Sequence, residues 1–197
     1  MRNGIFPFRV RAIRWILIYI CIILLCLVLS ENWGCSKSNP VEQSKLDSFF
    51  PLAIGLKWKY VNVIAAEDSF QIFVTKDTVI QGNRYFEVLD SGKKKLLRWN
   101  QKQQLIIWDT LSNRDKVFLD FAVSVNDSSG EEGYVLVSKT DTVSTLTGNF
   151  SNCYTFSQGL PFIIQERSYA KSIGLVQLLK ERGARQSKYV LKSYMRQ

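Results

Sequence analysis

The feature that most constrains the fold is an alternation of apolar and polar side chains at every second position, which recurs from residue 57 to residue 195. The clearest example is KVFLDFAVSV, residues 116–125. Asp120 and Ser124 lie on one face of this segment, which is the pattern of a strand with one side on a core and the other in water. The opposite face carries five apolar side chains, namely Val117, Leu119, Phe121, Val123 and Val125.

The same period of two describes most of the remaining chain and predicts an all-β domain. No segment of ten residues beyond the N-terminal region shows a helical period. Similar alternating runs cover residues 57–65, 70–80, 84–90, 95–100, 104–109, 134–139, 141–147, 152–157, 165–171, 174–180 and 188–195.

The connections between these runs are short and have the composition of hairpin loops. They are QGN at 81–83, NQKQ at 100–103 and SKTD at 138–141, and only residues 126–133 form a longer loop. Hairpin following hairpin predicts an antiparallel meander of about eleven strands. A sheet of this size curls or closes, so we expect a half-barrel or barrel, with a two-sheet sandwich as the alternative.

The N-terminal region has the three parts of an export signal. Residues 1–14 carry four arginines and no acid, and residues 15–30 contain no charge. The segment Ser30-Glu31-Asn32-Trp33-Gly34-Cys35 follows. Basic, apolar and small polar segments in that order indicate export, and the positive flank stays on the cytoplasmic side. We therefore expect the β domain outside the cytoplasm, preceded by a signal or anchor segment.

One fate of this segment is acylation. A cysteine directly after Gly34 resembles the bacterial lipoprotein box, in which Cys35 would be the lipid anchor and the new N-terminus. That box usually has an aliphatic residue three positions before the cysteine and a small residue two positions before it. Asn32 and Trp33 stand there in this chain. The lipoprotein interpretation is the favoured one.

Two other fates stay open. A signal anchor would span the membrane with sixteen uncharged residues, which reach about 24 Å in a helix against a core of ~30 Å. Trp15 and Trp33 at the two interfaces could make up the difference. Free secretion fits least well, because residues 30–32 are a poor cleavage site. In every case we expect three parts: 1–34 as signal peptide or anchor, 35–48 as a polar tether, and 49–197 as the β domain.

The net charge of the chain excludes few classes of partner. The chain has 26 basic and 17 acidic residues, and beyond residue 34 there remain 22 and 16. The densest basic cluster is Lys93-Lys94-Lys95 with Arg98, directly after the turn signal Asp90-Ser91-Gly92. A solvated hairpin tip explains it most simply, and a contact with anionic lipid is the alternative. Export argues against nucleic acid as a partner.

Catalytic chemistry has little support in the sequence. The chain has no histidine, the commonest general base and metal ligand. It has no G-x-S-x-G, P-loop or C-x-x-C motif. We predict a protein that is not an enzyme and has no cofactor and no metal site. A hydrolase that uses two carboxylates from distant strands is the alternative.

Aromatic residues are the remaining candidates for ligand contact. Trp58, Trp99 and Trp108 lie on β runs and could line an apolar pocket or stack on a sugar, although ordinary core packing is the simpler interpretation. The loop at 100–103 predicts that the rings of Trp99 and Trp108 lie near each other. Cys153 is expected to be a small buried apolar residue.

Four segments resemble a group of mostly uncharacterised bacterial lipoproteins. FFPLAIGLKWKY (49–60) is similar to their opening, and SYAKSIGLVQLL (168–179) to their Tyr-Ala-x-x-Ile-Gly-Leu-Val segment. LTGNFSNCYTF (146–156) resembles their Gly-x-Phe-x-x-Cys segment, and YVLKSY (189–194) resembles their closing strand. The four segments occur in the same order along the chain as in that group. The resemblance implies an exported, lipid-anchored β domain of the bacterial cell envelope. It implies no reaction and no catalytic residue.

We therefore expect a membrane-tethered envelope protein with a non-catalytic binding or scaffold domain. Its partners would be the membrane, through the N-terminus, and either an apolar ligand or another envelope protein. The alternatives are the carboxylate hydrolase of envelope polymers and a single-pass, signal-anchored protein with a structural role.

Overall fold

The computed structural model describes residues 48–160 and 163–196, and this part of the chain is all-β, with no helix in either range. None of these residues forms a helix long and apolar enough to cross a membrane. The predicted fold class is confirmed, with twelve strands where about eleven were expected. The strands are β1 (Leu56–Asn62), β2 (Ser69–Ile80), β3 (Asn83–Asp90), β4 (Lys93–Trp99), β5 (Gln104–Asp109), β6 (Arg114–Asp120), β7 (Ser128–Ser129), β8 (Tyr134–Thr145), β9 (Gly148–Leu160), β10 (Ile163–Ala170), β11 (Gly174–Arg182) and β12 (Arg185–Arg196).

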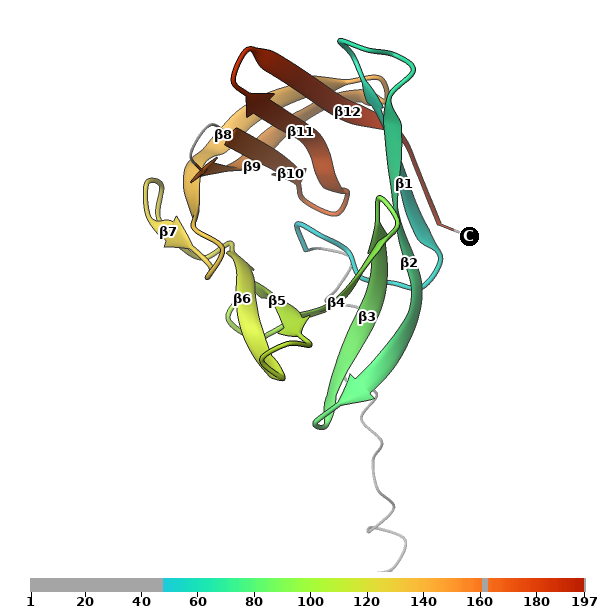
Figure 1. Cartoon of the computed structure of the whole chain (residues 1–197), viewed down its shortest axis with the longest axis vertical. Helices are drawn as coiled ribbons and strands as arrows, with labels where there is room; N and C mark the ends of the chain where they lie inside the picture. Colours follow the sequence, from blue (N-terminus) through green and yellow to red (C-terminus); the bar gives the residue numbers. More distant parts are fainter. Residues whose placement is uncertain (1–47, 161–162, 197) are drawn as a thin grey trace, which may run out of the picture. The chain divides into compact units, whose positions relative to one another are not determined.

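All twelve strands belong to one antiparallel sheet, which curls into a nearly closed barrel (Figure 1). The order across the sheet is β6-β5-β4-β3-β2-β1-β12-β11-β10-β9-β8-β7. Spatial neighbours are therefore neighbours in sequence, except where β1 pairs with β12. That pairing places Trp58 opposite Tyr194 and Asn62 opposite Tyr189, and it joins the two halves of the meander.

The two edges of the sheet, β6 and β7, meet at an unsealed seam. The Ser129 hydroxyl accepts a hydrogen bond from the Asp120 backbone N–H at 2.7 Å and donates to the Asp120 carbonyl at 3.0 Å. The Glu131 backbone N–H donates to the Val117 carbonyl at 2.8 Å. These bonds occupy edge groups that would otherwise be available to another strand.

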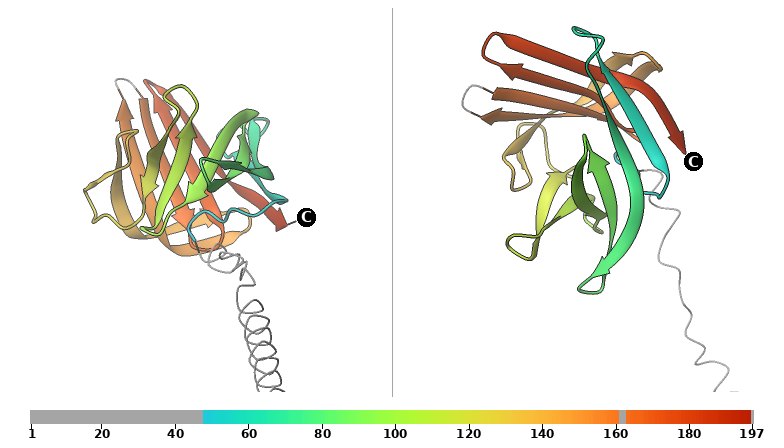
Figure 2. Two further views of the ribbon diagram at one scale, coloured as in Figure 1. Left: turned by 90° about the horizontal axis from the view of Figure 1, so that it is seen from below. Right: turned by 45° about the vertical axis from the view of Figure 1, so that its right-hand side comes forward.

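The segment before β1 closes one end of the barrel (Figure 2). Phe49 stacks on Phe121 with ring centroids 5.1 Å apart, and Phe50 stacks on Trp58 at 5.2 Å. The Trp99 indole N–H donates to the Phe50 carbonyl at 2.8 Å. Two aromatic contacts and one partly buried hydrogen bond thus hold this plug inside the barrel wall.

The strand predicted across residues 116–125 ends earlier than its apolar pattern indicates. β6 stops at Asp120, so Val123 and Val125 lie outside it. Leu119 pairs with Leu105, but Val117 pairs with Ile106, which leaves Phe118 as an extra residue. A bulge of this kind turns both Phe118 and Leu119 toward buried positions, and the strict alternation is lost.

The hairpin predicted at residues 138–141 is wrong. These residues lie inside β8, which continues to Thr145, and the hairpin turn comes at Leu146 and Thr147. The pairing of β8 with β9 shifts register three times between Leu136 and Val143. The polar composition that resembles a loop therefore marks a bend in one long strand, and this bend creates the groove described next.

Candidate functional site

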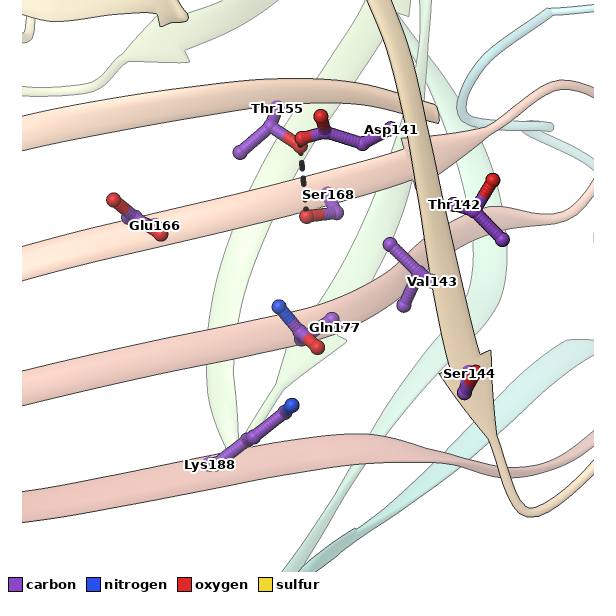
Figure 3. A pocket seen from close by; sticks show the side chains of 9 residues that line it. All are labelled: Asp141, Thr142, Val143, Ser144, Thr155, Glu166, Ser168, Gln177 and Lys188. Carbon is purple, nitrogen blue, oxygen red and sulfur yellow. Dashed lines mark hydrogen bonds between the residues drawn. The ribbon is translucent and has the colours of Figure 1, made fainter. Parts of the chain in front are cut away.

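A groove lies on the outer face of the sheet, where the β8–β9 hairpin bends over the neighbouring strands. The Leu146 backbone N–H at the hairpin tip donates to the Leu191 carbonyl of β12 at 3.2 Å. Figure 3 shows the end of β8, with Thr142, Val143 and Ser144, passing in front of the strands that carry Glu166, Gln177 and Lys188. The bent strand is one wall, and the sheet is the floor.

The groove has a volume of about 370 Å³, and eight of its nine lining residues are polar or charged. Ligand pockets typically have volumes of about 300–1,000 Å³ and are mostly apolar, so this groove has the usual size and an unusual lining. The lining residues are Asp141, Thr142, Val143, Ser144, Thr155, Glu166, Ser168, Gln177 and Lys188.

The floor of the groove follows from strand register. Thr155 of β9 lies opposite Ser168 of β10, and Ser168 lies opposite Gln177 of β11. Glu166 shares their face two residues along β10, because side chains alternate along a strand. The next residue in the same strand, Arg167, faces the interior of the barrel. Outward-facing polar positions of adjacent strands thus form one continuous row.

A hydrogen-bonded chain fixes the groove at its centre. The Thr155 hydroxyl donates to the Asp141 carboxylate at 2.5 Å and lies 3.0 Å from the Ser168 hydroxyl. Thr155 and Ser168 are only 5% and 2% exposed. Buried hydroxyls whose partners are fixed have few alternative rotamers. Asp141 is therefore held in place against the floor.

The charged groups of the groove carry a net charge of −1, from Asp141, Glu166 and Lys188. Within the part of the chain that the structure describes, none of the three forms an ion pair. No charged side chain of the described residues therefore neutralises them, although the Asp141 carboxylate already accepts a hydrogen bond from Thr155. A neutral or cationic polar molecule fits this lining, and an acyl chain does not.

The three tryptophans named as weak candidates do not line the groove. Trp58 is fully buried, and its indole N–H donates to the Ile173 carbonyl at 2.6 Å. Trp99 is half-buried beside Phe121. Trp108 is 8% exposed and packs edge-on against Tyr85.

The expected contact between Trp99 and Trp108 is wrong. Trp99 pairs with Leu105, so Trp108 is three residues further along β5. An odd separation places two side chains on opposite faces of a sheet. The rings accordingly pack in different places, Trp99 at the plug and Trp108 on the other face.

Of the two cysteines discussed above, only Cys153 lies among the described residues. Cys35, the expected lipid anchor, lies outside the described residues. Cys153 is buried and is a free thiol, and its S–H donates to the Phe150 carbonyl at 3.2 Å. Burial raises the pKa of Cys153 to about 11. It pairs with Asp141 on the β8–β9 ladder and so supports the groove wall as a small apolar residue.

One cavity inside the barrel is small. A cavity bounded by Phe50, Ile72, Leu105, Phe118 and Leu175 has a volume of only about 20 Å³. That volume is close to the space of a single water molecule. This cavity therefore offers no room for an acyl chain. The described residues also contain no group of three or more His, Cys, Asp or Glu side chains that could hold a metal ion.

Comparisons with known proteins find two distant structural likenesses and no family. No protein-family model and no curated protein matches the chain. A candidate exported protein of Bacteroides fragilis with a YmcC-like fold aligns at 13% identity and a TM-score of 0.49, over 76% of this chain and 100% of that one. A candidate lipoprotein of Parabacteroides distasonis aligns at 15% identity and a TM-score of 0.46, over 76% and 99%.

Proposed function

We propose that the chain is a tethered envelope protein whose β domain binds a polar, hydroxyl-rich ligand of saccharide size in the outer groove, without catalysis. The observation that carries this proposal is the lining of the groove, which is polar over a volume of about 370 Å³. Its charged side chains have no ion-pair partner among residues 48–160 and 163–196.

The export part of the proposal rests on the sequence. The basic and apolar N-terminal segments, followed by Gly34-Cys35, resemble a bacterial lipoprotein signal, from which Asn32 and Trp33 depart. Acylation of Cys35 would leave a polar tether of about a dozen residues before the plug at Phe49. The groove would then face the space outside the cytoplasm.

The chemistry of the lining favours a sugar-like ligand over a lipid. Carboxylates accept hydrogen bonds, the Lys188 amine donates them, and the Gln177 amide and the hydroxyls do both. A polyhydroxyl compound satisfies such a mixed set, whereas an alkyl chain would leave these groups desolvated without partners. The excess of one negative charge favours an amino sugar over an acidic one.

A second candidate function is hydrolysis by two carboxylates, because Asp141 and Glu166 line the same groove. Glu166 lies two residues from Ser168, a distance of about 7 Å along a strand. Ser168 is hydrogen-bonded to Thr155, which in turn holds Asp141. This candidate function requires Asp141 and Glu166 to lie about 6.5–9.5 Å apart, as the two acids of inverting glycosidases do.

The test uses three trisaccharides with different charge: chitotriose, its fully deacetylated cationic form, and trigalacturonic acid. Calorimetric titration of the β domain is expected to show binding of the first two and none of the third. Glu166→Gln is expected to weaken binding of the cationic sugar about tenfold. Glu67→Gln is the matched control, because Glu67 is exposed in the loop between β1 and β2 and lies outside the groove.

Two outcomes would decide against the proposal. Equal losses of affinity in Glu166→Gln and Glu67→Gln would show that the ligand binds outside the groove. Absence of binding to all three sugars would exclude sugars as the ligand. Release of shorter sugars from chitohexaose, abolished by both Asp141→Asn and Glu166→Gln, would replace binding with hydrolysis.

A further inference from the structure

The barrel end opposite the plug, called the mouth below, carries several basic residues. Strand register shows which of their side chains face the interior of the barrel. Leu178 of β11 lies opposite Tyr189 of β12, and both are buried in the core. Alternation along these strands then directs Lys180, Arg182 and Arg185 to the same inner face, near the turn that joins β11 to β12.

Strands β10 and β4 add more cations to this mouth. On β10, Arg167 lies opposite Leu178 and therefore faces inward. On β4, Lys95 lies opposite Val88, which is buried inside, and Lys93 shares its face. The inner face of the mouth thus holds six cationic side chains: Lys93, Lys95, Arg167, Lys180, Arg182 and Arg185.

Acidic partners are too few to balance these cations. Asp90 pairs with Lys95 at 2.8 Å, and Asp68 at the rim accepts a hydrogen bond from Tyr189. No other member of the six forms an ion pair with a described residue. Arg182 lies directly opposite Arg185, and like charges in that position destabilise a hairpin. An excess of positive charge is therefore built into the mouth.

Arg167 and Lys180 lie against aromatic rings, which hold these side chains in place without neutralising their charge. The Arg167 guanidinium lies 5.4 Å from the Phe118 ring centroid and 5.6 Å from that of Tyr134. The Lys180 amine lies 5.6 Å from the Tyr189 ring. Loss of solvation, followed by repulsion from Arg167, lowers the pKa of Lys180. The electrostatic cost of this cluster would fall when an anion binds.

We infer that this mouth is a second binding site, distinct from the outer groove, and that it takes the phosphate or carboxylate group of an anionic ligand. Arginine and lysine at close quarters are the side chains that recognise such groups. The cavity beneath, of about 20 Å³, admits no acyl chain, so only a headgroup enters. The turn that joins β11 to β12 lies at the end of the barrel opposite the plug (Figure 2).

The test measures binding of tripolyphosphate by calorimetry at low salt, and binding of vesicles of phosphatidylglycerol and of phosphatidylcholine by flotation. We expect binding of tripolyphosphate or of the anionic vesicles. The double variant Arg182→Gln/Arg185→Gln is expected to weaken it about 10- to 100-fold. Lys102→Gln/Lys192→Gln is the matched control, because it removes the same charge at two exposed positions outside the mouth.

The two probes distinguish the source of the anion. Binding of tripolyphosphate alone supports a soluble ligand, and binding of the phosphatidylglycerol vesicles alone supports a lipid headgroup. Equal losses in both double variants would show attraction by net charge only and would overturn the site. Absence of binding to either probe at millimolar phosphate and 20 mM NaCl would also overturn it. None of these results depends on the sugar titrations.

Discussion

Gly130 approaches Phe118 so closely that a Cβ atom on this glycine would lie 2.5 Å from the Phe118 carbonyl oxygen and 2.6 Å from that of Val117. Real Cβ atoms do not come so near to backbone oxygen. Gly130 also has a φ of +81°, which L side chains rarely adopt. The loop before β8 can therefore reach the edge of β6 only because this residue has no side chain.

Gly130→Ala is therefore expected to destabilise the β domain by about 2–4 kcal/mol, since it combines a backbone clash with an unfavourable φ. The measurement is the free energy of unfolding in urea. Gly133→Ala is the control, because Gly133 has a φ of +76° and nothing within 4 Å of the added Cβ. Its expected cost is about 1 kcal/mol. Equal costs at the two positions would show that the seam contact contributes nothing.

Tyr60→Phe tests a buried bond between the two halves of the meander. The Tyr60 hydroxyl donates to the Leu175 carbonyl at 2.8 Å, and the side chain is fully buried. Loss of the hydroxyl leaves that carbonyl without this donor, which is expected to cost about 1–2 kcal/mol of unfolding free energy. Tyr154→Phe makes the same chemical change at a half-buried ring and is expected to stay within about 0.5 kcal/mol. A cost at Tyr60 no larger than that at Tyr154 would contradict the prediction.

The meander could be predicted because each hairpin is local. Alternating side chains and short polar loops define most strands and pair each one with its neighbour. A glycine within a strand pattern, such as Gly174 between Ile173 and Leu175, indicates a close backbone approach, and a Cβ atom added to Gly174 would lie 3.3 Å from the Trp58 indole nitrogen. The pairing of β1 with β12 has no such local signal, because it joins residues more than 120 positions apart.

The groove could not be predicted for two reasons. Its residues come from five strands, and all but Val143 are polar residues that look solvent-exposed in the sequence. They form a site only because β8 bends at residues 138–141, where the composition indicated a turn. Part of the mouth could be predicted more easily, because alternation along a strand places the first and third side chains of Lys93-Lys94-Lys95 on the same face. Lys94 points to the other face and pairs with Glu87 at 2.5 Å.

Cys153 is expected to be nearly inert to iodoacetamide in the folded protein at pH 8. Its pKa of about 11, raised by burial, leaves about one thousandth of the thiol ionised at that pH. The raised pKa also gives a stability contribution that is complete below about pH 9, the ordinary value, and is lost as the pH rises toward 11.

Cys153→Ala should therefore flatten the decline of stability between about pH 9 and 11, whatever constant cost the substitution adds. Unfolding in urea at a series of pH values provides the slope. Rapid alkylation of the native protein at pH 8 would show that the thiol is accessible, and an unchanged slope in the variant would show that folding does not raise the pKa of Cys153.

Acylation of Cys35 predicts a specific mass for the protein purified from membranes of a bacterium with lipoprotein processing. The expected species begins at Cys35, ends at Gln197 and carries a diacylglyceryl group, with or without an N-acyl chain. Cys35→Ser should block the modification and leave the N-terminal segment attached, because that processing requires the thiol. A wild-type mass that begins at Met1 would instead make residues 15–33 a membrane anchor and Cys35 an incidental thiol.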